Sequence, residues 1–298
     1  MCVISIGEIL WDVFENTSRI GGAPFNVAAH TLKIGHDAVF ISAVGDDESG
    51  NQALQELRSE GLDDRFVRRI DGVKTGTVDV RIANGQPRFR IHRPAAYDYL
   101  EVSEADLTVL RQMNPVWIYV GTLAQMSSQV REATDNVLND CVSAKVFYDV
   151  NLRENNYSCE VIRSLLAKAD VVKINLEELG TLQDLLHIRN RERRMACASI
   201  GSTFDISGIC VTAGEEGAWW WSADADRQWI KVPGYSISVA DAVGAGDAFS
   251  AGMIHGFIME WLWEETLDFA NRLGALVASK EGALPEWTFE ELTVLARG

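Results

Sequence analysis

The chain has 298 residues, of which 47% are hydrophobic and 23% are charged, a composition typical of a globular protein. Its 27 basic and 43 acidic side chains give a formal net charge of −16, which argues against nucleic acid and anionic membranes as partners because both attract basic surfaces. No run approaches the roughly 20 apolar residues that span a bilayer, and no basic segment precedes the first apolar residues, as it would in a signal peptide.

The five cysteines are scattered along the sequence and form no CxxC motif or Cys/His cluster. Neither a disulfide framework nor a zinc site is therefore expected. Together with the composition, this predicts a soluble, reduced protein of the cytoplasm.

Short apolar runs alternate with helical stretches along almost the whole chain. In chain order, strands are expected in VISIGEILWD, DAVFISAVG, PVWIYVG, KVFYDVN, DVVKIN, GICVTAG and AWWWSA. Helices are expected in PFNVAAHTLKIG, GNQALQELRSEG, SSQVREATDNVLNDC, SCEVIRSLLAKA, and over 247–263 and 265–280. Strands that alternate with helices form right-handed βαβ units. The sequence therefore predicts an α/β protein with a mostly parallel sheet.

One segment departs from this alternation. Between Val73 and Ile91 polar and apolar residues alternate, and Asn84-Gly85 separates two runs. This pattern predicts a β-hairpin. The hairpin is either part of a small sheet standing off the main domain, as a lid would, or an antiparallel edge of the main sheet.

The basic run over 188–196 is interpreted as a solvated helix face.

The stretch VADAVGAGDAFSAG, residues 239–252, places glycines directly before a predicted helix. A helix start presents unpaired N–H groups and the positive end of the helix dipole, and small residues let a phosphate approach the backbone. Asp247 then has two interpretations. It is an N-cap residue, or it is a carboxylate with a chemical role beside a bound phosphate.

Polar residues also follow several of the predicted strands. Because ligands of α/β sheets bind at the carboxyl ends of strands, these residues are candidates for one site. They are Asp12, the GGAPFN stretch from Gly21 to Asn26, Gly45-Asp46-Asp47, Asp149 to Arg153, Asn175 to Glu178, and Thr212 to Gly214.

Taken together, these residues resemble the ribokinase (PfkB) family of sugar kinases, and are closest in appearance to bacterial fructokinases. DAVGAGD is similar to the DTxGAGD signature of that family, and GGAPFN followed by GDDESG is similar to its N-terminal signature. The resemblance implies a three-layer α/β/α fold in a single domain over 1–298, with a small β lid from about 12–20 and 72–97. It also implies a homodimer formed through the lid.

The resemblance assigns roles to individual residues. Asp247 matches the general base that takes the proton of the sugar hydroxyl, and Gly244, Ala245 and Gly246 match the backbone that holds the transferred phosphoryl group. Asp12, Gly21, Gly22 and Asn26 match residues that bind sugar hydroxyls. Arg90, Arg93 and Arg153 are further candidates for contacts with the substrate.

On the nucleotide side, the resemblance implies ATP and Mg²⁺. Asn175 and Glu178 match the N-x-x-E motif that organises Mg²⁺ through water, Thr212, Gly214 and Gly217 match a nucleotide loop, and Asn271 matches a residue near the adenine. Asp241 and Gly282 are candidate ligands of a monovalent cation such as K⁺. Ala242 replaces the threonine that is usual in the signature, which puts the local turn or the cation site in doubt.

The expected reaction is transfer of the γ-phosphoryl group of ATP to a primary hydroxyl of a sugar. RPAAYDYL (93–100) and DVNLR resemble the corresponding stretches of fructokinases, and this resemblance favours D-fructose. The alternatives are 2-keto-3-deoxygluconate, whose carboxylate an arginine would pair with, and the substrate of another PfkB-type sugar or nucleoside kinase. A Rossmann oxidoreductase is disfavoured because the first predicted strand ends in GEILWD and is not followed directly by G-x-G-x-x-G. A non-catalytic relative is disfavoured because Asp247 and its glycines are present.

Overall fold

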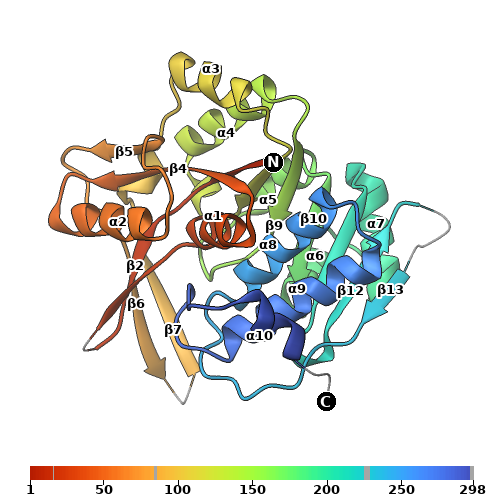
Figure 1. Ribbon diagram of the computed structural model, residues 1–298. Coiled ribbons are helices and arrows are strands. Elements are labelled where there is room, and N and C mark those ends of the chain that lie inside the picture. Colours follow the sequence, from red (N-terminus) through yellow and green to blue (C-terminus); the bar gives the residue numbers. More distant parts are fainter. Residues whose placement is uncertain (16, 84–85, 225–228, 296–298) are drawn as a thin grey trace. The chain divides into compact units, whose positions relative to one another are not determined.

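The computed structural model describes residues 1–15, 17–83, 86–224 and 229–295 (Figure 1). It divides into two compact units, Met1–Ala144 (unit 1) and Lys145–Gly298 (unit 2). Within the described residues, no helix has the length and apolar character needed to cross a membrane.

Unit 1 contains a parallel sheet. Its strands are β1 (Cys2–Ile6), β4 (Asp37–Gly45), β5 (Val67–Ile70) and β8 (Trp117–Gly121), and β1 pairs in parallel with both β4 and β8. Helix α1 (Ala23–Ile34) packs on β1, β4 and β8. Its start is favoured by Pro24, and it ends at Gly35, which has a left-handed backbone.

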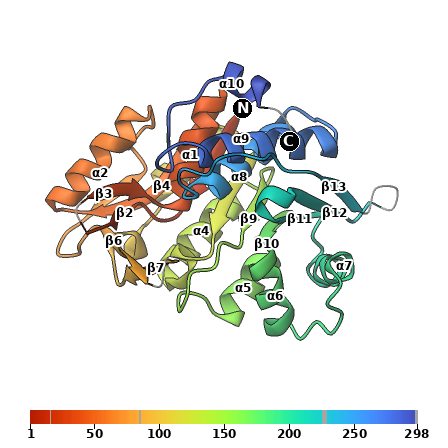
Figure 2. The same ribbon diagram turned by 90° about the horizontal axis from the view of Figure 1, so that it is seen from below.

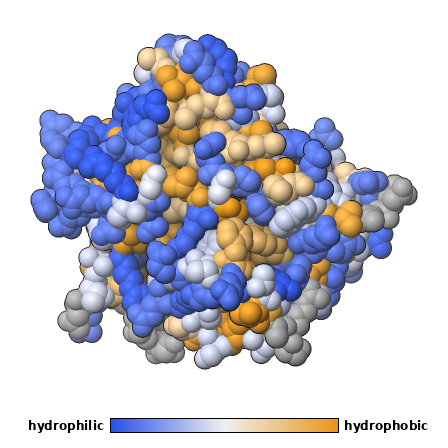
Figure 3. Space-filling view, viewed as in Figure 1, coloured by the Kyte–Doolittle hydropathy of each residue, from blue (hydrophilic) through white to orange (hydrophobic). Residues whose placement is uncertain are grey.

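The other helices of unit 1 are α2 (Glu48–Ser59), α3 (Glu104–Gln112) and α4 (Ser128–Asp140), with the short 3₁₀ helices η1 (Ala96–Tyr99) and η2 (Ala124–Met126). Helix α2 buries Ala53, Leu54 and Leu57 and presents a hydrophilic outer face (Figure 3). Serine side chains cap α3 and α4.

A second, four-stranded sheet in unit 1 confirms the predicted extra sheet. It contains β2 (Leu10–Val13), β3 (Ser18–Gly21), β6 (Gly76–Ala83) and β7 (Gln86–His92), in the order β3-β2-β6-β7. The expected single strand VISIGEILWD is wrong, since it divides into β1 and β2, which belong to different sheets, and Asp12 therefore lies within a strand. The predicted Asn84-Gly85 turn lies outside the described residues. We call this four-stranded sheet the small sheet.

Unit 2 contains β9 (Lys145–Asp149), β10 (Val171–Asn175), β11 (Gly208–Thr212), β12 (Ala218–Ser222) and β13 (Trp229–Val232). The first three pair in parallel, and β12 and β13 continue in antiparallel fashion. In Figure 2, α8 (Ala245–Ile258) and α9 (Trp263–Ala278) lie on one face of these strands, and α5 (Cys159–Leu166), α6 (Leu176–Leu185) and α7 (Arg193–Phe204) lie on the other. Two short elements complete the unit, η3 (Gly214–Glu216) between β11 and β12 and α10 (Phe289–Val294) near the C-terminus.

The predicted α/β class with a mostly parallel sheet is thus confirmed. The two helices expected over 247–263 and 265–280 begin two residues earlier than predicted. Of the basic run 188–196, only the part from Arg193 onward belongs to a helix, α7. The single domain over 1–298 stays a prediction.

Candidate active site

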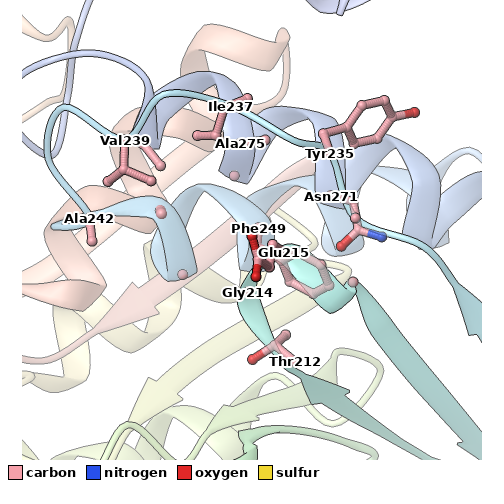
Figure 4. Close-up of a pocket in the computed structure, with 16 residues that line it drawn as sticks. Thr212, Gly214, Glu215, Tyr235, Ile237, Val239, Ala242, Phe249, Asn271 and Ala275 are labelled. Carbon is pink, nitrogen blue, oxygen red and sulfur yellow. The ribbon is translucent and has the colours of Figure 1, made fainter. Parts of the chain in front are cut away.

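A pocket of about 290 Å³ in unit 2 brings together residues that the sequence singled out separately (Figure 4). The end of β11 and η3 form one side, α8 and α9 form another, and the segment that carries Tyr235, Ile237 and Val239 passes across the pocket. Six of the predicted residues line it: Thr212, Gly214, Gly217, Ala245, Gly246 and Asn271. The predicted nucleotide loop and the glycine-rich start of α8 therefore face one cavity.

The remaining wall is largely apolar and was not predicted. It includes Ile237, Val239, Ala275 and Ala278. The two alanines belong to the sequence GALVA of α9, whose small residues at helical spacing were the available signal. The segment over 233–238, which carries Tyr235 and Ile237, has no regular secondary structure and no motif, so nothing in its pattern marked it. An apolar wall with few polar groups is typical of a site for a small organic molecule.

Gly244 sets the geometry at the start of α8. It is the N-cap residue and has a φ of 81°. A Cβ atom at this position would lie 2.5 Å from Cα of Ala283, so neither the backbone angle nor the space admits a side chain. Asp247 follows in the first turn of α8 and is half-buried. The first-turn N–H groups of the helix, which have no partner within the helix itself, lie at Gly246 and Asp247.

Close packing explains why residue 217 is a glycine. Its φ is 93°, and a Cβ atom would lie 2.1 Å from the carbonyl oxygen of Val232. The glycine therefore lets the chain after β13 pass directly against η3. Asn271 braces the same segment, because its side-chain amide nitrogen lies 3.4 Å and 3.2 Å from the carbonyl oxygens of Val232 and Pro233.

A buried charged cluster lies at the sheet ends next to α8. The ammonium nitrogen of Lys173 on β10 lies 2.7 Å from a carboxylate oxygen of Asp149 on β9, and Ser250 of α8 donates to the same oxygen at 2.9 Å. Burial by itself lowers the pKa of Lys173, but the charge and hydrogen bond of Asp149 outweigh burial and raise it above its ordinary value. Sequence reasoning missed Lys173. The available signal was a charged residue that interrupts the apolar run of VVKIN.

Asn175 and Glu178 form a reciprocal cap at the start of α6. The amide oxygen of Asn175 accepts from the N–H of Glu178, and the carboxylate of Glu178 accepts from the N–H groups of Asn175 and Leu152. Burial and then the charge of Asp149 raise the pKa of Glu178, and Lys173 and the two N–H groups offset this in part. Both carboxylate oxygens are thus engaged with the backbone, which fits a contact with Mg²⁺ through water better than direct coordination.

The predicted cation ligands Asp241 and Gly282 also meet. The N–H of Gly282 lies 3.2 Å from one carboxylate oxygen of Asp241, and the N–H of Val243 lies 3.0 Å from the other. Asp241 therefore ties the loop before α8 to the loop after α9. In the part of the chain that the structure describes, no group of three or more His, Cys, Asp or Glu side chains is arranged to hold a metal ion.

The predicted sugar-binding residues lie in unit 1. Asp12 is on β2, and a Cβ atom on Gly21 of the paired strand β3 would lie 2.7 Å from the Asp12 carboxylate. Gly22 is the N-cap of α1 with a φ of 117°, and its carbonyl accepts from the N–H of the buried Asn26. These four residues are therefore neighbours, at the junction of the small sheet and α1.

The three candidate arginines differ in their surroundings. Arg93 lies just after β7, contacts Asp98, and donates to the carbonyl oxygen of Leu123 at 2.8 Å, so much of its guanidinium serves to hold the chain around η1. Arg90 on β7 and Arg153 after β9 are exposed. Arg90 and Arg93 belong to unit 1, and Arg153 belongs to unit 2.

Comparisons with known proteins identify the family. The model of the pfkB family of carbohydrate kinases matches residues 6–288. A fructokinase of Escherichia coli is 30% identical over 299 residues, with 94% of each chain covered, and fructokinase-1 of Oryza sativa subsp. japonica is 28% identical over 310 residues, with 95% of this chain and 93% of the relative covered.

Among solved structures, a fructokinase with bound ATP from Xylella fastidiosa shares the fold, with a TM-score of 0.84, 23% identity, and 99% of this chain and 97% of that chain covered. The two signatures, the pocket at the start of α8 and the match over nearly the whole sequence agree. The chain belongs to the pfkB family of carbohydrate kinases and is a phosphotransferase that acts on a sugar.

Proposed function

We propose that this sugar kinase transfers the γ-phosphoryl group of ATP to the primary hydroxyl of D-fructose and so forms fructose 6-phosphate. The proposal for ATP is carried by the pocket of unit 2, where a nucleotide loop and a glycine-rich helix start line one cavity. The proposal for fructose is supported by the names of the relatives and by RPAAYDYL and DVNLR in the sequence.

The nucleotide occupies the pocket with its base against the apolar wall of Ile237, Val239 and Ala275, and with its phosphates toward the start of α8. Backbone N–H groups and the helix dipole attract the phosphates there. Such local positive potential lets an acidic protein bind a polyanion.

Asp247 acts as the general base. Phosphoryl transfer depends on positioning and on stabilisation of charge more than on covalent chemistry. The carboxylate accepts the proton of the sugar hydroxyl while the hydroxyl oxygen attacks the γ-phosphorus in line. ADP is the leaving group. Gly244, Ala245 and Gly246 supply the backbone that holds the phosphoryl group during transfer.

Unit 1 supplies the sugar contacts. The carboxylate of Asp12 accepts from sugar hydroxyls and the amide of Asn26 both donates and accepts, while Gly21 and Gly22 leave room for the ring. Arg90, Arg93 and Arg153 are proposed as further substrate contacts. The small sheet acts as the lid that excludes water from ATP, and as the surface through which two copies pair.

Mg²⁺ accompanies ATP and neutralises part of the charge on its phosphates. Glu178 and Asn175 would hold it through water, in agreement with the engagement of both Glu178 oxygens by backbone N–H groups. Asp241 and Gly282 are the proposed surroundings of K⁺.

The test is ATP-dependent phosphorylation by the purified protein with Mg²⁺ and K⁺, across fructose, ribose, 2-keto-3-deoxygluconate, a nucleoside and fructose 6-phosphate. The expected result is the highest kcat/KM with fructose. A clear preference for another of these acceptors would overturn the assignment of fructose and leave the mechanism of Asp247 standing. No turnover with any of them, together with no ATP binding in calorimetry, would contradict the proposal as a whole.

A further inference from the structure

Lys173 is a buried cation in the interior of unit 2. Its side chain is 9% exposed, and that of its partner Asp149 is 1% exposed. The two residues lie side by side on the paired strands β9 and β10. Apolar residues of similar volume often replace such a buried ion pair without loss of stability, and sometimes with a gain. Stability alone therefore does not account for the pair.

The pair is tied to the start of α8. Ser250, one turn after Gly246, lies within hydrogen-bond distance of both the Asp149 carboxylate and the Gly246 carbonyl oxygen, at 2.9 Å and 3.0 Å. A Cβ atom on Gly246 would lie 3.4 Å from the ammonium nitrogen of Lys173. Gly246 itself lines the nucleotide pocket. The ammonium group thus reaches the glycine turn from within the protein.

The ammonium group of Lys173 forms an ion pair with the Asp149 carboxylate at 2.7 Å, and a carboxylate at this distance favours the charged form of the lysine. The carboxylates of Glu178 and Asp247 also act on it electrostatically. Lys173 therefore carries a positive charge next to the turn that holds Asp247. A cation at this place offsets the repulsion between those carboxylates and a bound phosphate.

We propose that Lys173 supplies a fixed positive charge to the anion-binding turn over 244–247, and that Asp149 is the positioning residue that holds it there. The inference rests on the proposed function of this turn as the site of the transferred phosphoryl group. Negative charge spreads over the phosphoryl oxygens during transfer, and a cation already in place stabilises that charge without reorganisation. Ser250 orients the Asp149 carboxylate that holds the lysine.

The first experiment measures nucleotide binding, so that it does not depend on knowing the sugar. Calorimetry with ATP and with ADP, both in Mg²⁺, is carried out on the wild type and on Lys173→Met and Lys173→Arg. Lys173→Met is expected to bind ATP about tenfold more weakly and ADP nearly as well as the wild type, because only ATP carries the γ-phosphoryl group. Lys173→Arg keeps the charge and is expected to recover part of the loss. Equal ATP affinity in all three proteins would overturn the proposal.

The second experiment separates the role of the charge from the stability of the fold. Asp149→Asn leaves an unpaired lysine, whereas Asp149→Asn combined with Lys173→Met removes both charges, so the double variant is expected to unfold at a higher temperature than Asp149→Asn. Its kcat with the sugar accepted by the wild type is nonetheless expected to stay about 100-fold below the wild type. Recovery of kcat together with stability would show a structural role only and overturn the proposal.

Val172→Ala is the matched control. Val172 is the fully buried neighbour of Lys173 on β10, and successive strand residues point to opposite faces of the sheet. The substitution is expected to lower the unfolding temperature while leaving kcat and the ATP affinity near wild type. If the wild type bound no ATP, the proposed function would fail. If the wild type bound ATP and Lys173→Met bound it equally well, only the inference about Lys173 would fail.

Discussion

The two units hold their parts of the site in different ways. In unit 2, the pocket is lined largely by glycine, alanine and apolar side chains, and the buried ion pair of Lys173 and Asp149 is hydrogen-bonded to Ser250 of α8. In unit 1, the candidate site consists of the side chains of Asp12 and Asn26 at the junction of α1 and a four-stranded sheet. In the proposed function, recognition of the nucleotide therefore resides largely in the backbone of unit 2, and recognition of the sugar resides in side chains of unit 1.

The largest effect is expected at Asp247. Asp247→Asn keeps the size of the side chain and removes the base, so kcat should fall by about 10³-fold while the affinity for ATP changes little. ADP release under saturating sugar measures the change. Glu177→Gln, which alters an exposed carboxylate on α6, is the control and should keep wild-type turnover. A folded Asp247→Asn protein with wild-type kcat would refute the assignment of the base.

A pair of substitutions tests whether unit 1 binds the sugar and unit 2 binds ATP. Asp12→Asn should raise KM for the sugar by about 10- to 100-fold, the effect of removing a charge-assisted hydrogen bond, and leave KM for ATP unchanged. Thr212→Val should raise KM for ATP by a smaller factor and leave KM for the sugar unchanged. Steady-state kinetics with each substrate varied in turn decide this. If both variants changed both constants equally, the contrast between the units would not hold.

Gly244→Ala tests the backbone of unit 2. The left-handed angle alone costs about 1–2 kcal/mol, and the close approach of Ala283 adds to it. The unfolding temperature should fall by several degrees, at about 2–4 °C per kcal/mol. Gly35→Ala is the matched control, because Gly35 has a φ of 105° but no atom within 4 Å of its added Cβ. Equal losses in the two variants would show that the contact with Ala283 contributes nothing.

The two units should differ in the pH range in which they lose stability. In unit 1, burial alone would raise the pKa of Asp47, but hydrogen bonds from Thr75 and Gly50 outweigh it and lower the pKa. Its contribution is complete above the unfolded value of about 3.9 and is lost as the pH falls through the lower folded pKa.

In unit 2, the pKa of Lys173 is raised, so its contribution is complete below about pH 10.4 and is lost as the pH rises through the folded pKa. Amide hydrogen exchange of Gly50 and of Ile174, measured as a function of pH, gives the acid limit of stability in unit 1 and the alkaline limit in unit 2. Loss of protection at both positions in the same pH range would contradict this expectation.

The smallest effect concerns the thiols. The five cysteines are free, and four of them are buried. Burial raises the pKa of Cys2 to about 11 and that of Cys197 to about 12, so neither forms a thiolate readily near neutral pH. Cys159, which is half-buried, is expected to react first with a thiol reagent. Mass spectrometry after brief labelling identifies the site, and modification of Cys210 before Cys159 would be the contrary result.

The sequence predicted elements well where a pattern was long and bounded. Strand β4 runs over the predicted residues, Asp37–Gly45, because its continuous apolar run ends at a glycine. Helix α3 and strand β5 were not predicted. Helix α3 buries only Leu107 and Leu110, and VRRI of β5 is short and half charged. Such elements are set by their neighbours in space rather than by their own periodicity.

The candidate site shows the same limit. The special helix start at Gly244 could be predicted from the sequence. Glycine is a poor helix former, so a glycine-rich stretch beside a helix indicates a special backbone conformation. The position of Lys173 within an apolar run was a visible signal, but its role could not be predicted, because its partner Asp149 lies 24 positions away in sequence and beside it on the sheet. The segment over 234–238 has no pattern, and only its position across the pocket gives it a role.

The tryptophans offer a consequence for spectroscopy. Seven of the nine belong to unit 2, and only Trp11 and Trp117 belong to unit 1. Trp220 is buried on β12 and stacks on Trp263 with ring centroids 4.7 Å apart. Intrinsic fluorescence of this protein will therefore be dominated by unit 2, and a change in emission on adding ATP or denaturant will report mainly on that unit.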